Sequence, residues 1–373
     1  MNTMPPAVGV YVHFPWCVRK CPYCDFNSHP LRGNLQEPEY RSALLLDLSA
    51  QLSGISSTII DTVFFGGGTP SLFSAETFAD LLAAMQPQLA VDAEITMEAN
   101  PGTLEHKPLD AYRQAGINRL SIGAQSFNPQ HLAKLGRIHS DGDIEQSFAS
   151  ARQAGFDNVN LDLMYALPGQ TVAEAIADLQ RAIDLGPEHL SWYQLTLEPK
   201  TEFYARPPTL PDEEVVCDIE EAGHQLLAEA GYSRYEISAY ARNGRVARHN
   251  VNYWSFGDYV GIGAGAHGKL SQEGHIVRTE KPKQPRLYLG DPLAIVHSPI
   301  AQDALAEEFL LNALRLVDGV DVDVFAVRTG LEITALQPQW QQMIDRGLMR
   351  ADRLAATGQG LRYLDSIISK FLS

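Results

Sequence analysis

The chain has 373 residues, 45% of them hydrophobic, and a single core stops growing at about 250–300 residues, so we expect one large unit and a smaller satellite domain. A formal net charge of −16 disfavours nucleic acid as a partner, because nucleic-acid-binding proteins neutralise phosphates with clustered Lys and Arg. The sequence has no run of about 18 uninterrupted apolar residues and no basic, apolar leader, which predicts a cytoplasmic protein.

Short β-branched or aromatic runs recur six times in the first half of the chain, each followed by Gly-rich or polar residues and a helical pattern. This alternation predicts a parallel sheet covered by crossover helices. We therefore expect an α/β fold, a partial (β/α)6 barrel over residues 1–240. The expected strands are Val8–Phe14, Thr62–Phe65, Glu94–Glu98, Arg119–Gly123, Asn158–Asp162 and Leu190–Leu195.

A helix is predicted at Asp212–Ala230, after the Pro-rich segment RPPTLP. A separate segment follows at 241–300. Residues 301–373 show helical patterns at Glu308–Leu316, Pro338–Arg346 and Gly360–Leu372, which predict a mainly helical, winged-helix-like domain. This domain has ten acidic against seven basic residues, so a role as a lid or interaction module is favoured over DNA binding.

Three of the four cysteines, Cys17, Cys21 and Cys24, form a C-x3-C-x2-C array. Such a cluster in a long chain indicates metal ligation in a reducing compartment and not a disulfide framework. Three thiolates on one loop can bind three irons of a cubane four-iron cluster and leave the fourth iron open for a ligand.

The alternative is a structural zinc site completed by His13, His29 or Cys217, because zinc takes four tetrahedral ligands. Zinc sites usually pair two cysteine knuckles, and no second knuckle is present, so the iron cluster is favoured. The remote Cys217 is expected to act as a small hydrophobe on the apolar face of its helix, and His267 receives no role.

Polar residues stand at the carboxyl ends of the expected strands, where a barrel of this kind has its active face. Glycines at 66–68 would let a ligand approach the backbone closely. Glu98 and Asp162 can accept hydrogen bonds from hydroxyls or an ammonium, while Gln125 and Arg137 can bind a carboxylate. One shared site is therefore predicted.

The cysteine array, preceded by Tyr11-Val-His-Phe-Pro, resembles the radical SAM superfamily. The resemblance implies a [4Fe-4S] cluster whose open iron chelates S-adenosylmethionine (SAM), together with a reductant for the cluster. Over nearly its full length the chain resembles the oxygen-independent coproporphyrinogen III oxidases and their HemW-type haem chaperone relatives. The motifs are YVHFPWCVRKCPYCDFNSH, FFGGGTPS, EANPGT, RLSIGAQSF, GRIH, NLDLMYALPGQT and LSWYQLTLEP.

Carried over position by position, the resemblance assigns the three cysteines to the cluster. It also implies a set of residues that contact SAM. These are Tyr11, Tyr23, Gly67, Gly68, Thr69, Glu98, Gln125, Arg137 and Asp162.

Two features separate the subgroups of this family. Oxidases usually carry a further cysteine where this chain has Phe26. The chain also has His249-Asn250-Val-Asn-Tyr253-Trp254, which resembles the H-N-x-x-Y-W motif that the chaperone group is thought to use for haem. The resemblance implies His249 as an axial ligand and Asn250, Tyr253 and Trp254 as haem contacts, whereas a lone histidine of this kind is more often a packed loop residue.

The resemblance therefore implies a haem chaperone that delivers haem to haem-requiring proteins such as respiratory cytochromes, with membrane contact only transient and through a partner. A homodimer is a further family-level expectation. The alternatives are an oxygen-independent coproporphyrinogen III oxidase, which would make the chain an enzyme, and a radical SAM enzyme that modifies tRNA. The oxidase activity is disfavoured by Phe26, and the tRNA activity by the acidic C-terminal domain.

Overall fold

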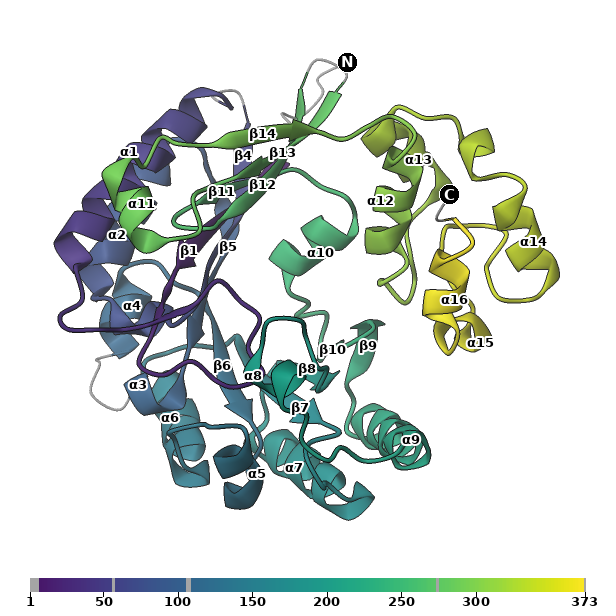
Figure 1. Ribbon diagram of the computed structural model, residues 1–373, viewed down its shortest axis with the longest axis horizontal. Helices are drawn as coiled ribbons and strands as arrows, with labels where there is room; N and C mark the ends of the chain where they lie inside the picture. Colours follow the sequence, from purple (N-terminus) through teal and green to yellow (C-terminus); the bar gives the residue numbers. More distant parts are fainter. Residues whose placement is uncertain (1–6, 56–57, 105–108, 273–274, 372–373) are drawn as a thin grey trace.

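A computed structural model describes residues 7–55, 58–104, 109–272 and 275–371. Its central feature is a twelve-stranded sheet in the order β14-β13-β12-β11-β1-β4-β5-β6-β7-β8-β10-β9. Figure 1 shows this sheet bent into an open barrel. The strands are β1 (Ala7–Phe14), β4 (Ile59–Gly67), β5 (Leu89–Ala99), β6 (Arg119–Gln125), β7 (Val159–Tyr165), β8 (His189–Gln194), β9 (Ser233–Glu236), β10 (Ala239–Ala241), β11 (Tyr259–Ile262), β12 (His267–Gln272), β13 (His275–Glu280) and β14 (Val296–Pro299), with a separate pair β2 (Trp16–Cys17) and β3 (His29–Pro30).

The parallel body of the sheet runs from β11 through β1 and β4–β8. All six strands expected from the sequence are confirmed, with their ends moved by a few residues. In β1, Val8, Val10, Val12 and Phe14 are at most 2% exposed because they form the core beneath the outer helices. The alternate residues of β1 face the barrel interior, as a period of two requires.

Except for the short helix at Glu202–Ala205, where the Phe203 N–H donates to Pro22 O, the helices of the first 230 residues cover the outside of the sheet (Figure 1). Their ends follow local chemistry: α7 begins at a capping box between Thr171 and Glu174 and ends at Gly186, which has φ 72°. These helices are α1 (Glu37–Ser53), α2 (Ala75–Met85), α3 (Pro101–Leu104), α4 (Leu109–Gln114), α5 (Pro129–Lys134), α6 (Asp141–Gln153), α7 (Val172–Leu185), α8 (Glu202–Ala205) and α9 (Glu213–Glu229), with a 3-10 turn η1 (Pro70–Leu72).

Helix α9 confirms the helix expected at Asp212–Ala230, and the Asp212 side chain caps it by accepting from the Val215 N–H. The prediction for Cys217 was wrong: its side chain is exposed, because the buried face of α9 passes through Ile219, Gly223 and Leu227.

The sheet continues past residue 240, where no strand was expected. Strand β11 pairs in parallel with β1, and β12–β14 extend this edge as antiparallel strands. The segment HNVNYW at 249–254, called the haem motif below, lies in helix α10 (Arg248–Trp254). This helix lies on the inner side of the curved sheet (Figure 1). Helix α11 (Pro285–Gly290) packs against α1.

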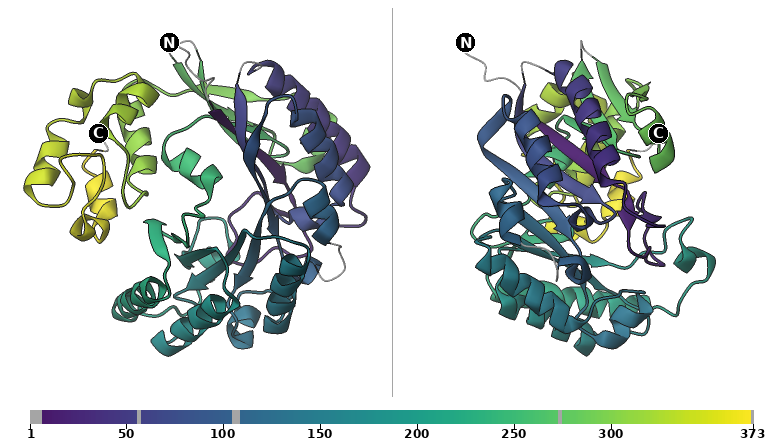
Figure 2. Two further views of the ribbon diagram at one scale, coloured as in Figure 1. Left: turned by 180° about the vertical axis from the view of Figure 1, so that it is seen from behind. Right: turned by 90° about the vertical axis from the view of Figure 1, so that its left-hand side faces the viewer.

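The C-terminal residues form a mainly helical unit with its own core, as expected. It joins both ends of the open sheet. At the β9 end, the Ile237 N–H donates to Arg315 O over 3.0 Å, and near the other end the Arg278 side chain of β13 pairs with Glu308 of the C-terminal unit. Figure 2 shows the unit beside the opening of the barrel. It contains α12 (Leu305–Ala313), α13 (Val322–Thr329), η2 (Ile333–Leu336), α14 (Gln339–Asp345), α15 (Gly358–Leu361) and α16 (Leu364–Ile368), of which α13 was not foreseen.

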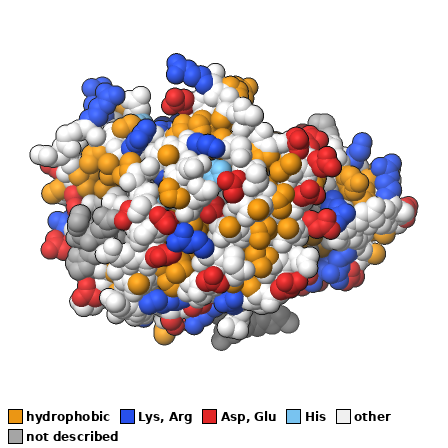
Figure 3. Space-filling view, turned by 90° about the horizontal axis from the view of Figure 1, so that it is seen from below, with side chains coloured by type: hydrophobic (Ala, Val, Ile, Leu, Met, Phe, Trp, Pro, Cys, Tyr) orange, Lys and Arg blue, Asp and Glu red, His pale blue; other side chains and the backbone are white. Residues whose placement is uncertain are grey.

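Charged groups are mixed over the surface in the view of Figure 3, where acidic and basic side chains alternate. Within the described ranges, no helix has the length and apolar character needed to cross a membrane.

A buried ion pair fastens α1 to the strands added late in the chain. Asp47 and Lys281 are 0% and 1% exposed at the side chain, and Lys281 Nζ lies 2.5 Å from Asp47 Oδ1. The Tyr288 hydroxyl and the Gly263 N–H donate to Asp47 Oδ2. Burial raises the pKa of Asp47, and Lys281 and these two donors offset that shift only in part.

We expect Lys281→Met to lower the free energy of unfolding by about 3–5 kcal/mol, since it leaves the Asp47 carboxylate buried without its counter-charge. Lys283→Met is the matched control, because Lys283 is 64% exposed in its pair with Glu280 and should change the value by less than about 1 kcal/mol. Urea unfolding followed by circular dichroism measures both. Equal stabilities of the two variants would contradict the assigned role of the ion pair.

Candidate functional site

A cavity of about 480 Å³ opens at the carboxyl ends of the parallel strands. The structure brings together there all three cysteines and every predicted SAM contact except Tyr11. The predicted residues that line it are Cys17, Cys21, Cys24, Tyr23, Gly67, Gly68, Thr69, Glu98, Gln125, Arg137 and Asp162.

Tyr11 lies one layer below this cavity, on the interior face of β1. Its hydroxyl hydrogen-bonds with His13 Nδ1 over 3.0 Å, and its ring stacks on Phe64 with centroids 6.1 Å apart. Tyr11 is therefore not among the residues that line the cavity.

The cysteine loop is held by hydrogen bonds to its own backbone and to distant loops. Lys20 Nζ donates to Phe26 O and Ser28 O, which closes the loop around Cys24. Asn27 Nδ2 donates to Ala264 O and to Lys283 O, both over 2.9 Å. In the right-hand view of Figure 2 the loop lies beside α8, where the Phe203 N–H donates to Pro22 O.

The thiol arrangement fits a four-iron cluster better than one zinc ion. The three cysteines line one cavity, yet within the described residues no three His, Cys, Asp or Glu side chains are grouped closely enough to hold a single metal ion. A cubane takes each thiolate at a different iron and needs no such convergence. Burial raises the pKa of Cys17 and of Cys24, so metal binding would displace their protons.

The glycine segment at the end of β4 presents backbone to the cavity. Gly67 has φ 113°, and a Cβ there would lie 2.5 Å from the His13 ring, so only glycine fits. Its N–H donates to Glu98 Oε2 over 2.9 Å. This bond aligns the two neighbouring strand ends.

Two buried carboxyl groups share the cavity. Burial, and secondarily the nearby Asp162, raise the pKa of Glu98 to about 8, against the lowering effect of the Gly67 N–H. Burial also raises the pKa of Asp162, although Ser121 Oγ and Asn160 Nδ2 donate to it. The pair therefore suits a ligand that brings positive charge.

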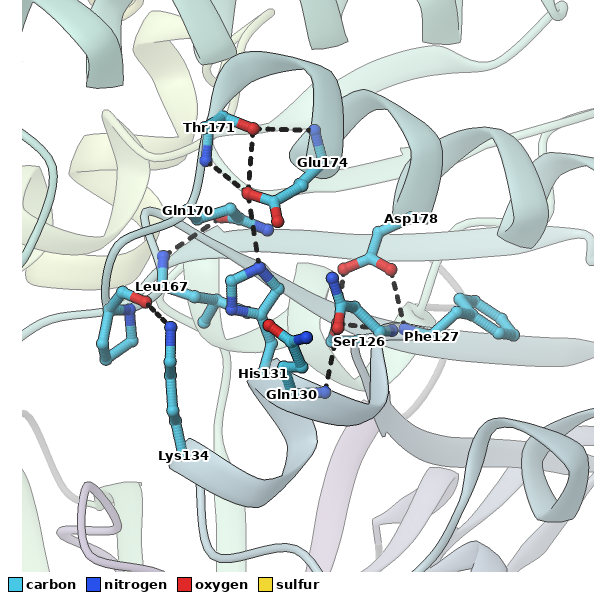
Figure 4. A network of polar contacts seen from close by, with 12 residues as sticks. Ser126, Phe127, Gln130, His131, Lys134, Leu167, Gln170, Thr171, Glu174 and Asp178 are labelled. Atoms are coloured by element: carbon cyan, nitrogen blue, oxygen red, sulfur yellow. Dashed lines mark hydrogen bonds and ion pairs between the residues drawn. The ribbon is translucent and has the colours of Figure 1, made fainter.

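Gln125 reaches the cavity from a strained turn, with φ 68° in a residue other than glycine. Asp178, on α7, holds the turn that follows: Ser126 Oγ donates to Asp178 Oδ2 over 2.5 Å and the Phe127 N–H to Oδ1 over 2.8 Å (Figure 4). Inside the cavity the Tyr193 hydroxyl donates to Gln125 Oε1 over 2.9 Å.

Sequence reasoning missed Tyr193 and Asp178. Tyr193 lies in the quoted motif LSWYQLTLEP but was given no role. The signal for Asp178 was an acidic residue on the apolar face of its helix, between Ala175, Leu179 and Ala182, where it is 6% exposed.

The structure places the haem motif in the barrel interior, away from the cysteines. His249 is 1% exposed, and burial lowers its pKa to about 3, so the imidazole is neutral. Both ring nitrogens are engaged at 2.8 Å, Nδ1 with Thr62 Oγ1 and Nε2 with the Tyr253 hydroxyl. Glu94 accepts from the Arg248 and His249 N–H groups and so caps α10.

The remaining motif residues are half-buried. Asn250 follows His249 on α10 and does not line the SAM cavity, while Tyr253 and Trp254 line a second, smaller cavity. The motif thus has one fully enclosed ligand candidate and a more accessible aromatic end.

We expect the binding of a cation such as SAM to release close to one proton at pH 7. With a pKa of about 8, Glu98 is mostly protonated in the free protein, and a bound cation favours its carboxylate form. Affinity should therefore rise with pH between about 6 and 8, by at most about tenfold per unit. Anaerobic calorimetry in two buffers of different ionisation enthalpy measures the release. Glu98→Gln should abolish it, and identical wild-type heats in both buffers would contradict the expectation.

We expect Asp178→Asn to weaken SAM binding by about tenfold, since it removes the anion that holds the turn after Gln125. Asp184→Asn, an exposed change on the same helix, is the control and should leave affinity unchanged. Binding is measured by equilibrium dialysis at a temperature where thermal melts show both variants folded. Wild-type affinity in Asp178→Asn would refute the role.

Comparisons with known proteins match both parts of the chain. Residues 11–182 match the radical SAM superfamily and residues 300–363 the HemN C-terminal domain. The chain is 45% identical to "Heme chaperone HemW" of Escherichia coli over 99% of both chains, and 33% identical to that of Bacillus subtilis over 98% and 99%. A mitochondrial relative of Bos taurus, "Radical S-adenosyl methionine domain-containing protein 1", is 34% identical over 99% of this chain and 89% of its own.

Among solved structures, coproporphyrinogen III oxidase (HemN) from Escherichia coli superposes with a TM-score of 0.82 over 98% of this chain and 90% of its own. At 22% identity this likeness shows the shared fold. Membership of the radical SAM superfamily implies a [4Fe-4S] cluster and SAM, and the cysteine cavity fits both. On the full-length identities, the chain belongs to the HemW family of radical SAM proteins.

Proposed function

We propose that this protein is a haem chaperone, which binds haem and delivers it to haem-requiring proteins. The observation that carries the proposal is the 45% identity to a protein named "Heme chaperone HemW" over 99% of both chains. Two features of the chain agree with it. Phe26 occupies the position of the further oxidase cysteine and is 57% exposed at the cavity rim, and the HNVNYW motif is intact.

The cluster and SAM support this function from the strand-end cavity. When bound, the cluster supplies an open iron that chelates SAM and an electron for its cleavage. This chain's own residues orient the ligand: the Gly67 segment offers backbone, Glu98 and Asp162 offer carboxyl groups, and Arg137 offers a guanidinium. A reductant must deliver the electron to the cluster. The Arg137 guanidinium also contacts the cysteine loop, because its Nη1 donates to Cys21 Sγ over 3.8 Å.

Haem ligation by His249 requires the surrounding interior to rearrange, because the side chain is 1% exposed and both ring nitrogens are hydrogen-bonded. Rotation of the Tyr253 side chain would free Nε2 for iron. Thr62 would stay on Nδ1 and fix the tautomer, as outer partners of metal-binding histidines usually do. The neutral imidazole is already in the protonation state that iron needs.

The recipients we propose are haem proteins such as respiratory cytochromes. Transfer to those in membranes would bring this chain to the bilayer transiently, through the recipient. We also propose that the protein forms a homodimer.

We expect anaerobically purified protein to bind about one haem per chain and His249→Ala to lose the Soret shift, since the ligand to the iron is then missing. Tyr253→Phe should bind at least as tightly, because it releases Nε2 without removing the ring. His275→Ala, an exposed histidine on β13, is the matched control. Cys17→Ser should keep haem binding, because the cluster lies in a separate cavity. Absorbance titration measures all of these.

Transfer is measured by adding a haem-free acceptor protein and following the loss of haem from the chain. If the wild-type protein does not bind haem, the chaperone function is refuted. If His249→Ala gives the same haem spectrum as wild type, only the assignment of His249 as the iron ligand is refuted. Incubation with coproporphyrinogen, reductant and SAM tests the oxidase alternative, and vinyl products would replace the chaperone-only assignment.

A further inference from the structure

A second cavity, of about 190 Å³, lies where the end of α10 meets β11–β13 and α12. It is separate from the cysteine cavity, and the two share no lining residue. The residues that line it are Tyr253, Trp254, Phe256, Tyr259, Lys269, Arg278 and Asn312.

One cation in this cavity is almost fully buried. Lys269 is 2% exposed, its Nζ lies 4.3 Å from the centroid of the Phe256 ring, and Asp258 Oδ1 is 3.0 Å away. Burial lowers the pKa of Lys269, and the neighbouring Arg328 and Arg278 act in the same direction, against Asp258. A further anion here would relieve that repulsion.

The charge around the cavity runs opposite to that of the whole chain. Arg278 pairs with Glu308, and the Arg315 guanidinium stands 4.2 Å over the Trp254 ring while pairing with Glu236. With Lys269 and Arg328 there are four cations against the three carboxylates Asp258, Glu308 and Glu236, in a chain of net charge −16.

Trp254, one of the lining residues, carries an unused donor. Trp254 Nε1 is buried and has no acceptor among the described residues. An indole N–H can only donate, so burying it without an acceptor is unfavourable. A ligand oxygen next to Trp254 would remove that cost.

We propose that this cavity binds a carboxylate group, held by the Trp254 N–H and the Lys269 and Arg278 side chains. The identity of the ligand rests on the proposed function: we take the carboxylate to be one of the two propionates of haem. Cavities for drug-sized ligands span about 300–1,000 Å³, so 190 Å³ suits a propionate arm and leaves the macrocycle outside it. Tyr253 connects the two parts, because it lines this cavity and also holds His249 Nε2.

The experiment compares haem with haem dimethyl ester, in which both carboxylates are masked. We expect wild type to bind haem at least about tenfold tighter than the ester, as one lost charged hydrogen bond would give. Arg278→Gln and Trp254→Phe should each bring this ratio close to one, because each removes one of the proposed partners of the carboxylate. Trp340→Phe is the matched control, since it removes an indole N–H that donates to Arg350 O inside the C-terminal core.

Equal affinities of wild type for haem and the ester would overturn the carboxylate site and leave the chaperone function standing. If wild type binds neither haem nor the ester, the chaperone function is refuted. The cavity is then tested alone by titration with propionate ion, followed by tryptophan fluorescence. A saturable change in wild type that Arg278→Gln lacks would then support a site for a different carboxylate, and no change in wild type would overturn the site.

Discussion

The placement of β1 between β4 and β11 is the constraint on which the site depends. Parallel strands end at one edge of a sheet, so three separate chain segments arrive there together. The end of β1 leads into the cysteine loop, β4 leads into the glycine segment, and β11 leads into the loop at Gly263. The fit is close on both sides of His13, since a Cβ on Gly67 would meet its ring at 2.5 Å and one on Gly263 its carbonyl at 2.4 Å.

Several polar side chains buried inside the barrel are uncharged at pH 7. Burial lowers the pKa of His13 and His139 to about 4 and that of His249 to about 3. At pH 7 these imidazoles act as hydrogen-bond partners only. Glu98 holds its proton as well. These four buried side chains therefore carry little charge at pH 7 in the absence of ligands.

The sequence was sufficient where local pattern decides the structure. The runs at Val8–Phe14 and Arg119–Gly123 are strands because apolar residues alternate there, and their ends placed the cysteines and Gln125 in one cavity. It was insufficient where distant contacts decide. The short segment Tyr259–Ile262 contains a glycine, and only its parallel pairing with β1 makes it part of the barrel.

Side-chain partners were equally hidden from the sequence. The motif implied a ligand role for His249, but no local pattern reveals that Thr62, 187 residues away, binds its Nδ1. In the same way, no local pattern reveals that Asp178 on α7 accepts hydrogen bonds from the turn after Gln125, about 50 residues earlier in the chain. The resemblance implied that Tyr11 contacts SAM, whereas on the interior face of β1 its hydroxyl bonds with His13 and its ring stacks on Phe64.

The anchoring of Asn27 has a consequence for how the protein is made. Its side-chain amide donates to carbonyls 237 and 256 residues further along the chain. The ribosome delivers the cysteines first and these carbonyls much later, and chains emerge at about 5–20 residues per second. For tens of seconds the nascent thiols stand in a loop without its anchors. The anchoring of the cysteine loop is therefore completed only after about three quarters of the chain has been synthesised.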